Sequence, residues 1–436
     1  MERSLSFIAD MNPTQPSLEL AWNGEQPRLA YSLLLFQTLT GCRWTRVASP
    51  GNERADLLWI RRGDADEWMV YELSEAWGRL ECVQADDQSL ETGCFKRPTS
   101  LKPDWLLSMV WMALRVEERF GAQDVHGRFV SGGSLAARMG VERIPWVHRW
   151  AESLAREWGL KVDKTLISKV YISVDVDHLL AFAGRSWWHV GLAGMRDVLH
   201  GKSGKALTRL RARAGGVDPY DTLLEQVDLW EGRPWNYFAL MQLSRSEQDS
   251  GVDFANRRAQ SLWKALDQKL NGALGWHPST GASKGAREGL LEQEYLQVSR
   301  LLDREVVRSR FHFLAFEPEI HYPILAGLGI REDHSMGYVD RMGWRAGIAV
   351  PYPWFDLEKN VVLDFWVHPF FAMDGHLLYY HPKDYPFDAW KKAYEECTVQ
   401  GVPFSWVTHW RLFSEVEPEW TGWKENVKMM AQWGEK

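Results

Sequence analysis

The chain has 436 residues, a length that favours two domains over one. It is 45% hydrophobic and 25% charged, as globular proteins are, and its net charge of -7 argues against nucleic acid or an anionic lipid surface as a partner. No stretch approaches 18 uninterrupted apolar residues, and residues 1–20 lack a secretory signal pattern, so we expect no membrane span and a cytoplasmic protein.

The first part of the chain, to about residue 165, combines helix and strand patterns. Its helix candidates carry apolar residues at helical spacing, and its strand candidates are short. The helices are Pro27–Thr40, Asp104–Phe120 and Ile144–Gly159, and the strands are Ala55–Ile60 and Glu67–Leu73. We therefore expect a smaller N-terminal α/β domain over residues 1–165.

After a charged joint at Lys161–Lys164, strand candidates follow one another, with helices between several of them. The strands are Val170–Asp177, Trp235–Leu243, Ala273–His277, Val306–Phe313, Ile330–Tyr338 and Pro403–Trp410, and the clearest helix is Ser283–Asp303. This alternation indicates a parallel sheet, either open or closed into a barrel. Residues 166–436 are expected to form this second domain.

Two aspartates, Asp175 and Asp177, end the first of these later strands. Side chains at positions i and i+2 of a strand share a face, so their Cα atoms would lie roughly 6–7 Å apart. The carboxyl ends of parallel strands are where such enzymes place their sites. Two neighbouring carboxylates repel, so one is protonated or a cation lies beside them. A solvated strand end capped by an aspartate is the alternative interpretation.

Later strands end in residues of compatible chemistry. His277 ends one strand, Arg308, Arg310 and His312 share a face of the next by alternation, and His409 lies near the end of the last. An arginine can orient a carboxylate that acts as a general base, and a histidine can donate a proton to a leaving amine. A packed histidine and a surface basic patch are the structural alternatives.

Several other chemistries lack their motifs. Gly201-Lys202-Ser203 is not a phosphate-binding loop, because position 196 is arginine where that motif requires glycine. The chain also contains no Gly-x-Ser-x-Gly elbow, no His-Glu-x-x-His pair and no dinucleotide-binding fingerprint. The strand-end residues are therefore the main chemical signal.

Taken together, these segments resemble the polysaccharide deacetylases (carbohydrate esterase family 4), in a branch where a short α/β domain precedes the barrel. The resemblance lies in Ser173–His178, Gly275–Ser279, Ser309–Leu314, Gly329–Tyr338, Gly343–Gly347, Pro351–Leu357 and Pro369–Asp374, with Arg115–Phe129 similar to the preceding domain. It implies a distorted (β/α) barrel with a metal-dependent N-deacetylase site at the carboxyl ends of its strands.

By position, the resemblance implies that Asp175 is the general base, that Arg310 orients it and that His409 is the acid. Some of the 25 tryptophans would lie at the mouth of a cleft, where flat faces suit sugar rings, although most must be core. The substrate-binding candidates are Trp276, Trp410 and Tyr338.

The resemblance also implies a divalent metal, zinc first, bound by Asp177 and His277. The wider family has a second metal histidine four residues after the first, and here that position is Gly281. A three-ligand zinc site therefore cannot be carried over intact. His178 and His312 are the candidate replacements, because both should lie near the same strand ends.

Three functions follow, in order of preference. The first is removal of N-acetyl groups from a surface or capsular polysaccharide or its precursor, so the partner would be an N-acetylated oligo- or polysaccharide. The second is a catalytically inactive glycan-binding or polysaccharide-assembly protein, which Gly281 favours. The third is a glycoside hydrolase, which needs a second acid across the cleft from Asp175. The candidates for that acid are Glu317, Asp333 and Asp374.

Overall fold

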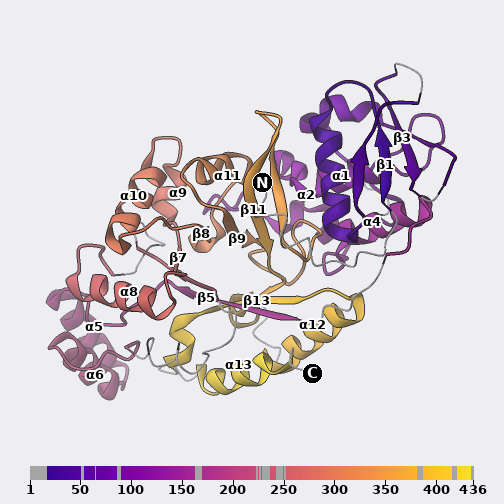
Figure 1. Cartoon of the computed structure of the whole chain (residues 1–436). Coiled ribbons are helices and arrows are strands. Elements are labelled where there is room, and N and C mark those ends of the chain that lie inside the picture. The colour runs from indigo at the N-terminus through magenta and orange to yellow at the C-terminus, as the bar shows by residue number, and fades with distance from the viewer. Residues whose placement is uncertain are drawn as a thin grey trace.

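A computed structural model describes residues 17–433 with internal gaps. The gaps are 51–53, 64, 86–89, 163–168, 222–223, 225–226, 228–235, 242–248, 250–251, 381–385 and 415–419. Within the described residues the chain is a mixed α/β protein with two sheets, one of four strands and one of nine. Figure 1 shows the small sheet and its helices beside one edge of the large sheet.

The small sheet has the strand order β2-β1-β3-β4, and only its β1–β2 pair is parallel. Its strands are β1 (Leu18–Ala21), β2 (Trp44–Arg46), β3 (Leu57–Arg62) and β4 (Met69–Glu72). Helices α1 (Pro27–Thr40), α2 (Trp105–Ala113) and α4 (Trp146–Glu157) pack on one another, and Figure 1 shows α1 and α4 beside this sheet. Helix α3 (Leu135–Arg138) is a single turn. The predicted helix at Pro27–Thr40 is confirmed, and Gly41 ends it in the left-handed conformation.

The helix predicted over Asp104–Phe120 is shorter than expected. It ends at Ala113, and Arg115 takes a left-handed φ of 56° before a 3₁₀ turn over Val116–Phe120. Arg115 is buried and pairs with Glu117 at 2.5 Å and Glu118 at 2.7 Å. These buried ion pairs accompany the change in backbone direction, which the apolar periodicity alone did not indicate.

The large sheet has the order β10-β11-β9-β8-β7-β6-β5-β13-β12, and every pair except β10–β11 is parallel. Its strands are β5 (Val170–Val176), β6 (Asn236–Ala239), β7 (Gly275–Trp276), β8 (Arg308–Ser309), β9 (Glu332–Met336), β10 (Tyr352–Asp356), β11 (Val361–Pro369), β12 (Ala372–Met373) and β13 (Phe404–His409). The sheet curls, but its edge strands β10 and β12 do not pair in the described part of the chain. The described strands therefore form a curled open sheet, and the distorted (β/α) barrel that the resemblance implies stays a prediction.

Helices cover the large sheet or extend from it (Figure 1). They are α5 (Trp187–Leu199), α6 (Ser203–Arg213), α8 (Arg257–Lys269), α9 (Thr280–Lys284), α10 (Leu290–Leu302), α11 (Pro318–Gly327), α12 (Pro386–Gln400) and α13 (Trp423–Ala431). The helix predicted at Ser283–Asp303 is divided into α9 and α10, with Gly289 at a φ of 78° between them. No helix among the described residues has the length and apolar character needed to cross a bilayer.

The two sheets share one continuous hydrophobic core. Tyr31 of α1 donates a hydrogen bond to the carbonyl of Pro353 in β10, and Tyr352 donates one to the carbonyl of Ala113. Most of the largest fully buried side chains are tryptophans, which fits their expected core role. The predicted boundary near residue 165 falls in 163–168, outside the described residues, so the division into two domains stays a prediction.

Candidate active site

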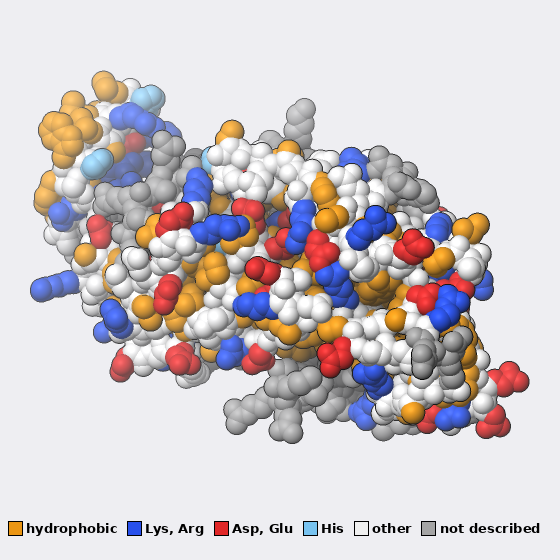
Figure 2. Space-filling view, turned by 90° about the horizontal axis from the view of Figure 1, so that it is seen from above, with side chains coloured by type: hydrophobic (Ala, Val, Ile, Leu, Met, Phe, Trp, Pro, Cys, Tyr) orange, Lys and Arg blue, Asp and Glu red, His pale blue; other side chains and the backbone are white. Residues whose placement is uncertain are grey.

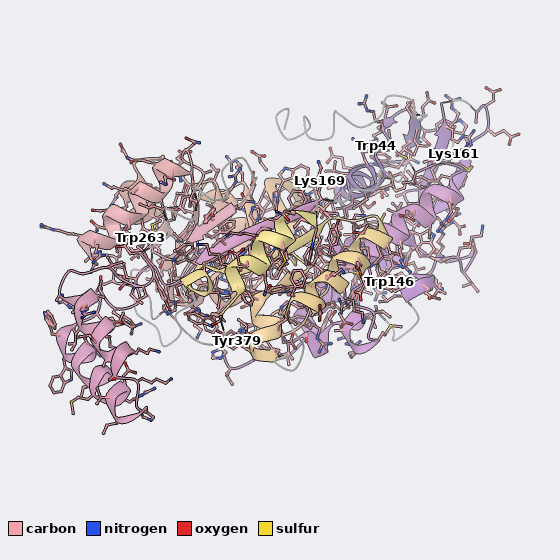
Figure 3. The ribbon with its side chains drawn as sticks, turned by 90° about the horizontal axis from the view of Figure 1, so that it is seen from below. Trp44, Trp146, Lys161, Lys169, Trp263 and Tyr379 are labelled. Atoms are coloured by element: carbon pink, nitrogen blue, oxygen red, sulfur yellow. The ribbon has the colours of Figure 1, made fainter. Side chains whose placement is uncertain are left out.

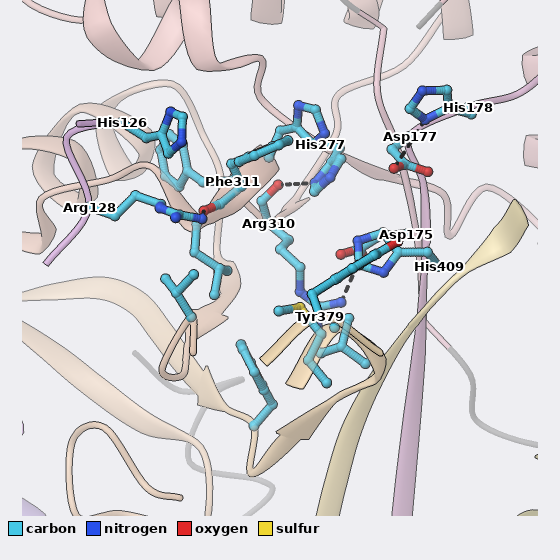
Figure 4. Close-up of a pocket in the computed structure, with 18 of the residues that line it drawn as sticks. His126, Arg128, Asp175, Asp177, His178, His277, Arg310, Phe311, Tyr379 and His409 are labelled. Carbon is cyan, nitrogen blue, oxygen red and sulfur yellow. Dashed lines mark hydrogen bonds and ion pairs between the residues drawn. The ribbon is translucent and has the colours of Figure 1, made fainter. Parts of the chain in front are cut away.

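A cavity of about 560 Å³ lies at the carboxyl ends of β5, β8 and β13 (Figure 4). Seven of the residues that the sequence singled out line it: Asp175, Asp177, His178, His277, Arg310, His312 and His409. Its volume lies in the range of small-molecule binding sites. Parallel strands bring these residues together although up to 234 positions separate them, as between Asp175 and His409, which are paired in the sheet.

Asp175 is held by Arg310 inside the protein. An Nη1–H of Arg310 donates to Oδ1 of Asp175 at 2.8 Å, and both side chains are at most 5% exposed. The same guanidinium donates to Oγ of Ser173 at 2.7 Å and to the carbonyl of His334 at 2.9 Å. Three acceptors therefore fix the arginine, and the arginine fixes the orientation of the carboxylate.

Asp177 has a different arginine partner, which sequence reasoning missed. Arg411 donates to Oδ2 of Asp177 at 2.8 Å, and Nδ1 of His178 lies 3.1 Å from the same oxygen. Burial would raise the pKa of Asp177, but Arg411 and His178 outweigh it and hold that pKa well below its usual value. Oδ1 of Asp177 is buried and has no hydrogen-bond partner among the described residues.

His277 presents one free ring nitrogen to the interior. Its Nδ1 lies 2.5 Å from the carbonyl oxygen of Arg310, and that oxygen can only accept, so Nδ1 carries the proton. Nε2 is buried and, within the part of the chain that the structure describes, has no partner. Burial lowers the pKa of His277 to about 4, so the ring is neutral at pH 7. A neutral histidine oriented through Nδ1 has the form of a metal ligand.

His312 lies beside His277 and is oriented by an aspartate. The two rings have centroids 5.0 Å apart, and Nδ1 of His312 lies 2.7 Å from Oδ1 of Asp249. Asp249 also accepts hydrogen bonds from the backbone amides of Thr280 and Gly281, each at 3.1 Å. Asp249 therefore connects His312 to the start of α9, which contains Gly281, the position where the wider family has its second metal histidine.

His409 and Asp374 form a hydrogen-bonded pair of the kind that serves as a general acid. Nδ1 of His409 donates to Oδ1 of Asp374 at 2.7 Å, and the backbone amide of His409 donates to Oδ2 at 2.6 Å. Burial would lower the pKa of His409, but Asp374 outweighs it and raises that pKa to about 9. The ring is therefore an imidazolium at neutral pH and can donate a proton.

The predicted metal ligands fit an ion only in part. Oδ1 of Asp177 and Nε2 of His277 are buried acceptors without partners among the described residues, as a bound cation would require. However, no three ligand atoms that include them lie within 4.8 Å of one another among the described residues. His178 and His312, the predicted replacements for the family's second histidine, therefore do not complete a compact three-ligand set in this arrangement.

A second group of potential ligands does have that spacing. We call Glu332, His334 and His368 the lower cluster, to distinguish them from the residues of the cavity. They belong to β9 and β11 and do not line the cavity. The Nε2 atoms of His334 and His368 lie 3.6 and 3.8 Å from Oε2 of Glu332. Arg308 already donates to that oxygen at 2.9 Å, and the two imidazole rings stack with centroids 4.3 Å apart.

The predicted aromatic substrate contacts are not at the cavity. Trp276, Trp410 and Tyr338 are at most 2% exposed and do not line it, because they form part of the core. Indole nitrogens there bond to protein acceptors, as Trp276 does to Glu294 at 3.2 Å. The exposed aromatic side chains that do line the cavity are Phe313, Tyr379 and Tyr380.

The glycoside hydrolase hypothesis loses its geometric basis. Its candidate second acids, Glu317, Asp333 and Asp374, do not line the cavity. Asp333 is buried with Ser309 and Ser335 as hydrogen-bond partners, and Asp374 is bonded to His409. A carboxylate free to act across the cavity from Asp175 is thus missing at these three positions.

No protein-family model and no curated protein matches the chain significantly. A crystal structure described as "putative polysaccharide deacetylase from Mycobacterium smegmatis" is 12% identical, over 60% of this chain and 83% of that one, with a TM-score of 0.38. A crystal structure of Puue allantoinase is also 12% identical, over 62% and 85%, with a TM-score of 0.34. At these values neither likeness carries an argument about activity, so the family remains a resemblance in sequence.

Proposed function

We propose that the chain is a hydrolase that removes the acetyl group from an N-acetylated saccharide, as part of the processing of a polysaccharide or its precursor. One observation carries this proposal: a carboxylate held by an arginine and an imidazolium held by a carboxylate line the same cavity. Acyl transfer from an amine to water needs a base and an acid of this kind on one bound substrate.

The residues would act in two proton transfers. Asp175 takes a proton from the attacking water as the water oxygen bonds to the acetyl carbon, and Arg310 keeps the carboxylate oriented. His409 then gives a proton to the amine nitrogen as the carbon–nitrogen bond breaks, which yields acetate and the free amine. The raised pKa of His409, about 9, keeps its proton available at neutral pH.

Asp177 and His277 would hold a divalent metal, since each has a buried acceptor atom without a partner among the described residues. Such an ion, when bound, polarises a carbonyl and acidifies water. Asp249 would orient His312 nearby, and Arg411 would keep Asp177 ionised. The identity of the metal belongs to the proposal, with zinc as first choice.

The test is acetate release from N-acetylated chitooligosaccharides by the full chain supplied with Zn²⁺. Asp175→Asn removes the base but keeps the shape, and we expect a rate about 10²–10⁴-fold lower. Asp364→Asn is the matched control, because Asp364 is a half-exposed residue of β11 outside the cavity. Unchanged release in Asp175→Asn would contradict the role of Asp175, and no release by the parent chain would contradict hydrolysis of this substrate.

A second candidate is glycan binding without turnover. Two observations favour it: position 281 is glycine, and Arg411 already neutralises Asp177. Calorimetry with the same oligosaccharides distinguishes the two functions. Binding without acetate release, in the presence of Zn²⁺, Mn²⁺ or Co²⁺, would favour this candidate over the hydrolase.

A further inference from the structure

Helices α5 and α6 form a hairpin that stands away from both sheets (Figure 3). They lie in the connection between β5 and β6 and pack on each other. Arg209 of α6 pairs with Asp197 of α5 at 2.9 Å, and the guanidinium of Arg213 lies 4.7 Å from the centre of the Trp187 ring. The hairpin is thus a defined element with one side of α5 turned away from α6.

That outer side of α5 is apolar and exposed. Its residues are Trp187, Trp188, Leu192, Met195, Val198 and Leu199, with Trp188 73% and Leu199 83% exposed and Trp187 at its edge, beside Arg213 of α6. At about 100° per residue they occupy a single arc of about 140°. The buried residues Val190 and Gly194 lie beyond the Trp187 edge of this arc, and Gly194 faces Ala206 of α6. Leu207 and Leu210 of α6 extend the exposed apolar surface.

The same hairpin is strongly basic. Between Arg185 and Arg213 there are seven lysines and arginines and one acid, Asp197, which gives a net charge of +6. The whole chain has -7, so the remainder carries -13. Figure 2 shows orange and blue side chains gathered on this knob at the upper left. The total charge therefore hides a local basic surface, so the net charge of -7 does not exclude anionic lipid as a partner of this hairpin.

We infer that the hairpin docks on a lipid bilayer with anionic headgroups, with the outer side of α5 inserted among them. A wide apolar arc flanked by lysine and arginine is the pattern of helices that lie in the bilayer interface. Tryptophan prefers that interface, and long basic side chains reach its phosphates. With 13 residues, α5 is about 20 Å long, so it lies along the surface and does not cross it.

The base of the hairpin is fixed to the cavity end of the sheet. The buried carboxylate of Asp218 accepts hydrogen bonds from the amides of Ala181, Phe182 and Ala183, each at 2.8 Å. This segment begins three residues after His178, which lines the cavity. Docking of the hairpin would therefore hold the cavity near the bilayer surface, whether the cavity hydrolyses its ligand or only binds it.

The experiment is co-sedimentation of the full chain with vesicles in 0.1 M NaCl. One set is pure phosphatidylcholine, and the other contains 30% phosphatidylglycerol. We expect binding to the anionic vesicles, at least tenfold weaker binding to the neutral ones, and loss of the preference at 0.5 M NaCl. No binding to either set, or equal binding to both, would overturn the proposal.

Variants of exposed residues locate the surface without threatening the fold. Trp188→Ser and Leu199→Ser should each weaken binding about tenfold or more, since each removes a side chain that the lipid would bury. Val399→Ser, at an 86% exposed position on α12, is the apolar control and should bind as the parent does. Lys202→Glu should weaken binding severalfold. Lys359→Glu, at an exposed position between β10 and β11 and outside the hairpin, should not.

Sedimentation velocity without lipid tests the competing occupant. If the parent chain self-associates, and Trp188→Ser abolishes this without changing vesicle binding, then the hairpin contacts a second copy and the lipid proposal is wrong. A monomeric parent chain that binds anionic vesicles through Trp188 and Leu199 supports it.

Discussion

The cavity and the lower cluster lie on the same sheet and use the same residue types, but they differ in environment. In the cavity the Asp175–Arg310 pair is at most 5% exposed, whereas in the lower cluster the Glu332–Arg308 pair is about 30% exposed. The two ion-pair distances, 2.8 and 2.9 Å, are nearly equal. Burial, and not contact distance, therefore separates a candidate site from a surface ion pair.

The two regions also divide the properties of a metal site between them. The lower cluster has three ligand atoms at suitable spacing, but Arg308 already bonds to its carboxylate. The cavity has two buried acceptors without partners among the described residues, on Asp177 and His277, but no compact third ligand. Spacing alone would select the lower cluster, in which Nε2 of His334 is also buried without a hydrogen-bond partner among the described residues. The cavity has two such atoms, and one of them is a carboxylate oxygen, which favours the cavity.

The largest expected effect is on turnover, and it is measured by substituting one histidine in each of the two regions. His409→Gln removes the imidazolium that lies against Asp374, so acetate release should fall about 10²–10⁴-fold. His368→Gln, in the lower cluster, should change it less than about twofold. Steady-state kinetics of the two variants measures this. Equal losses in both would remove the distinction between the regions.

Two arginines two residues apart test the difference in burial directly. Arg310→Met leaves Asp175 buried without its partner, which should lower the free energy of unfolding by about 3–5 kcal/mol. Arg308→Met breaks a pair that is about 30% exposed and should cost about 0–1 kcal/mol. Urea unfolding gives both values. In Arg310→Met with Asp175→Asn, part of the loss should return, and its absence would show that the cost is packing and not charge.

The parts of the fold that follow from local chemistry could be predicted from the sequence. Pro27 and Gly41 mark both ends of α1, and these bounds were predicted to the residue. Of the strand predicted at Val306–Phe313, only Arg308–Ser309 is observed, and a 3₁₀ turn over His312–Leu314, with Phe313 at a left-handed φ of 59°, occupies its predicted end. The α5–α6 hairpin was not predicted, since apolar periodicity is interpreted as a core face and here that face is exposed.

The site likewise contains residues that could be predicted from the sequence and partners that could not. Asp175, His277, Arg310 and His409 could be placed at one edge, because the carboxyl ends of parallel strands meet there. Arg411, Asp374 and Asp249 were not predicted as partners of these residues. They come from segments after or between strands, and only the tertiary arrangement brings Asp374 beside a histidine 35 positions later.

Metal content tests which region holds an ion. We expect about one zinc per chain after reconstitution and dialysis. His277→Ala should weaken its binding by more than the roughly 10–100-fold that loss of a group orienting a ligand costs, because it removes the ligand itself. Glu332→Gln, in the lower cluster, should leave the zinc content unchanged. Elemental analysis across a zinc titration measures both. If Glu332→Gln loses the ion and His277→Ala keeps it, the lower cluster is the metal site and the cavity assignment is wrong.

The smallest expected effect is a shift in pH dependence, and it isolates Asp374. The pKa of His409 is raised from 6.5 to about 9, so its acid form, and the stability gained from its pairing with Asp374, are complete below pH 6.5. Both should decline as the pH rises through 9. In Asp374→Asn the alkaline limb of acetate release should move from about 9 toward 6.5, and the decline in unfolding free energy between these pH values should flatten. Asp364→Asn is the control, and an unmoved limb in Asp374→Asn would mean that another group provides the acid.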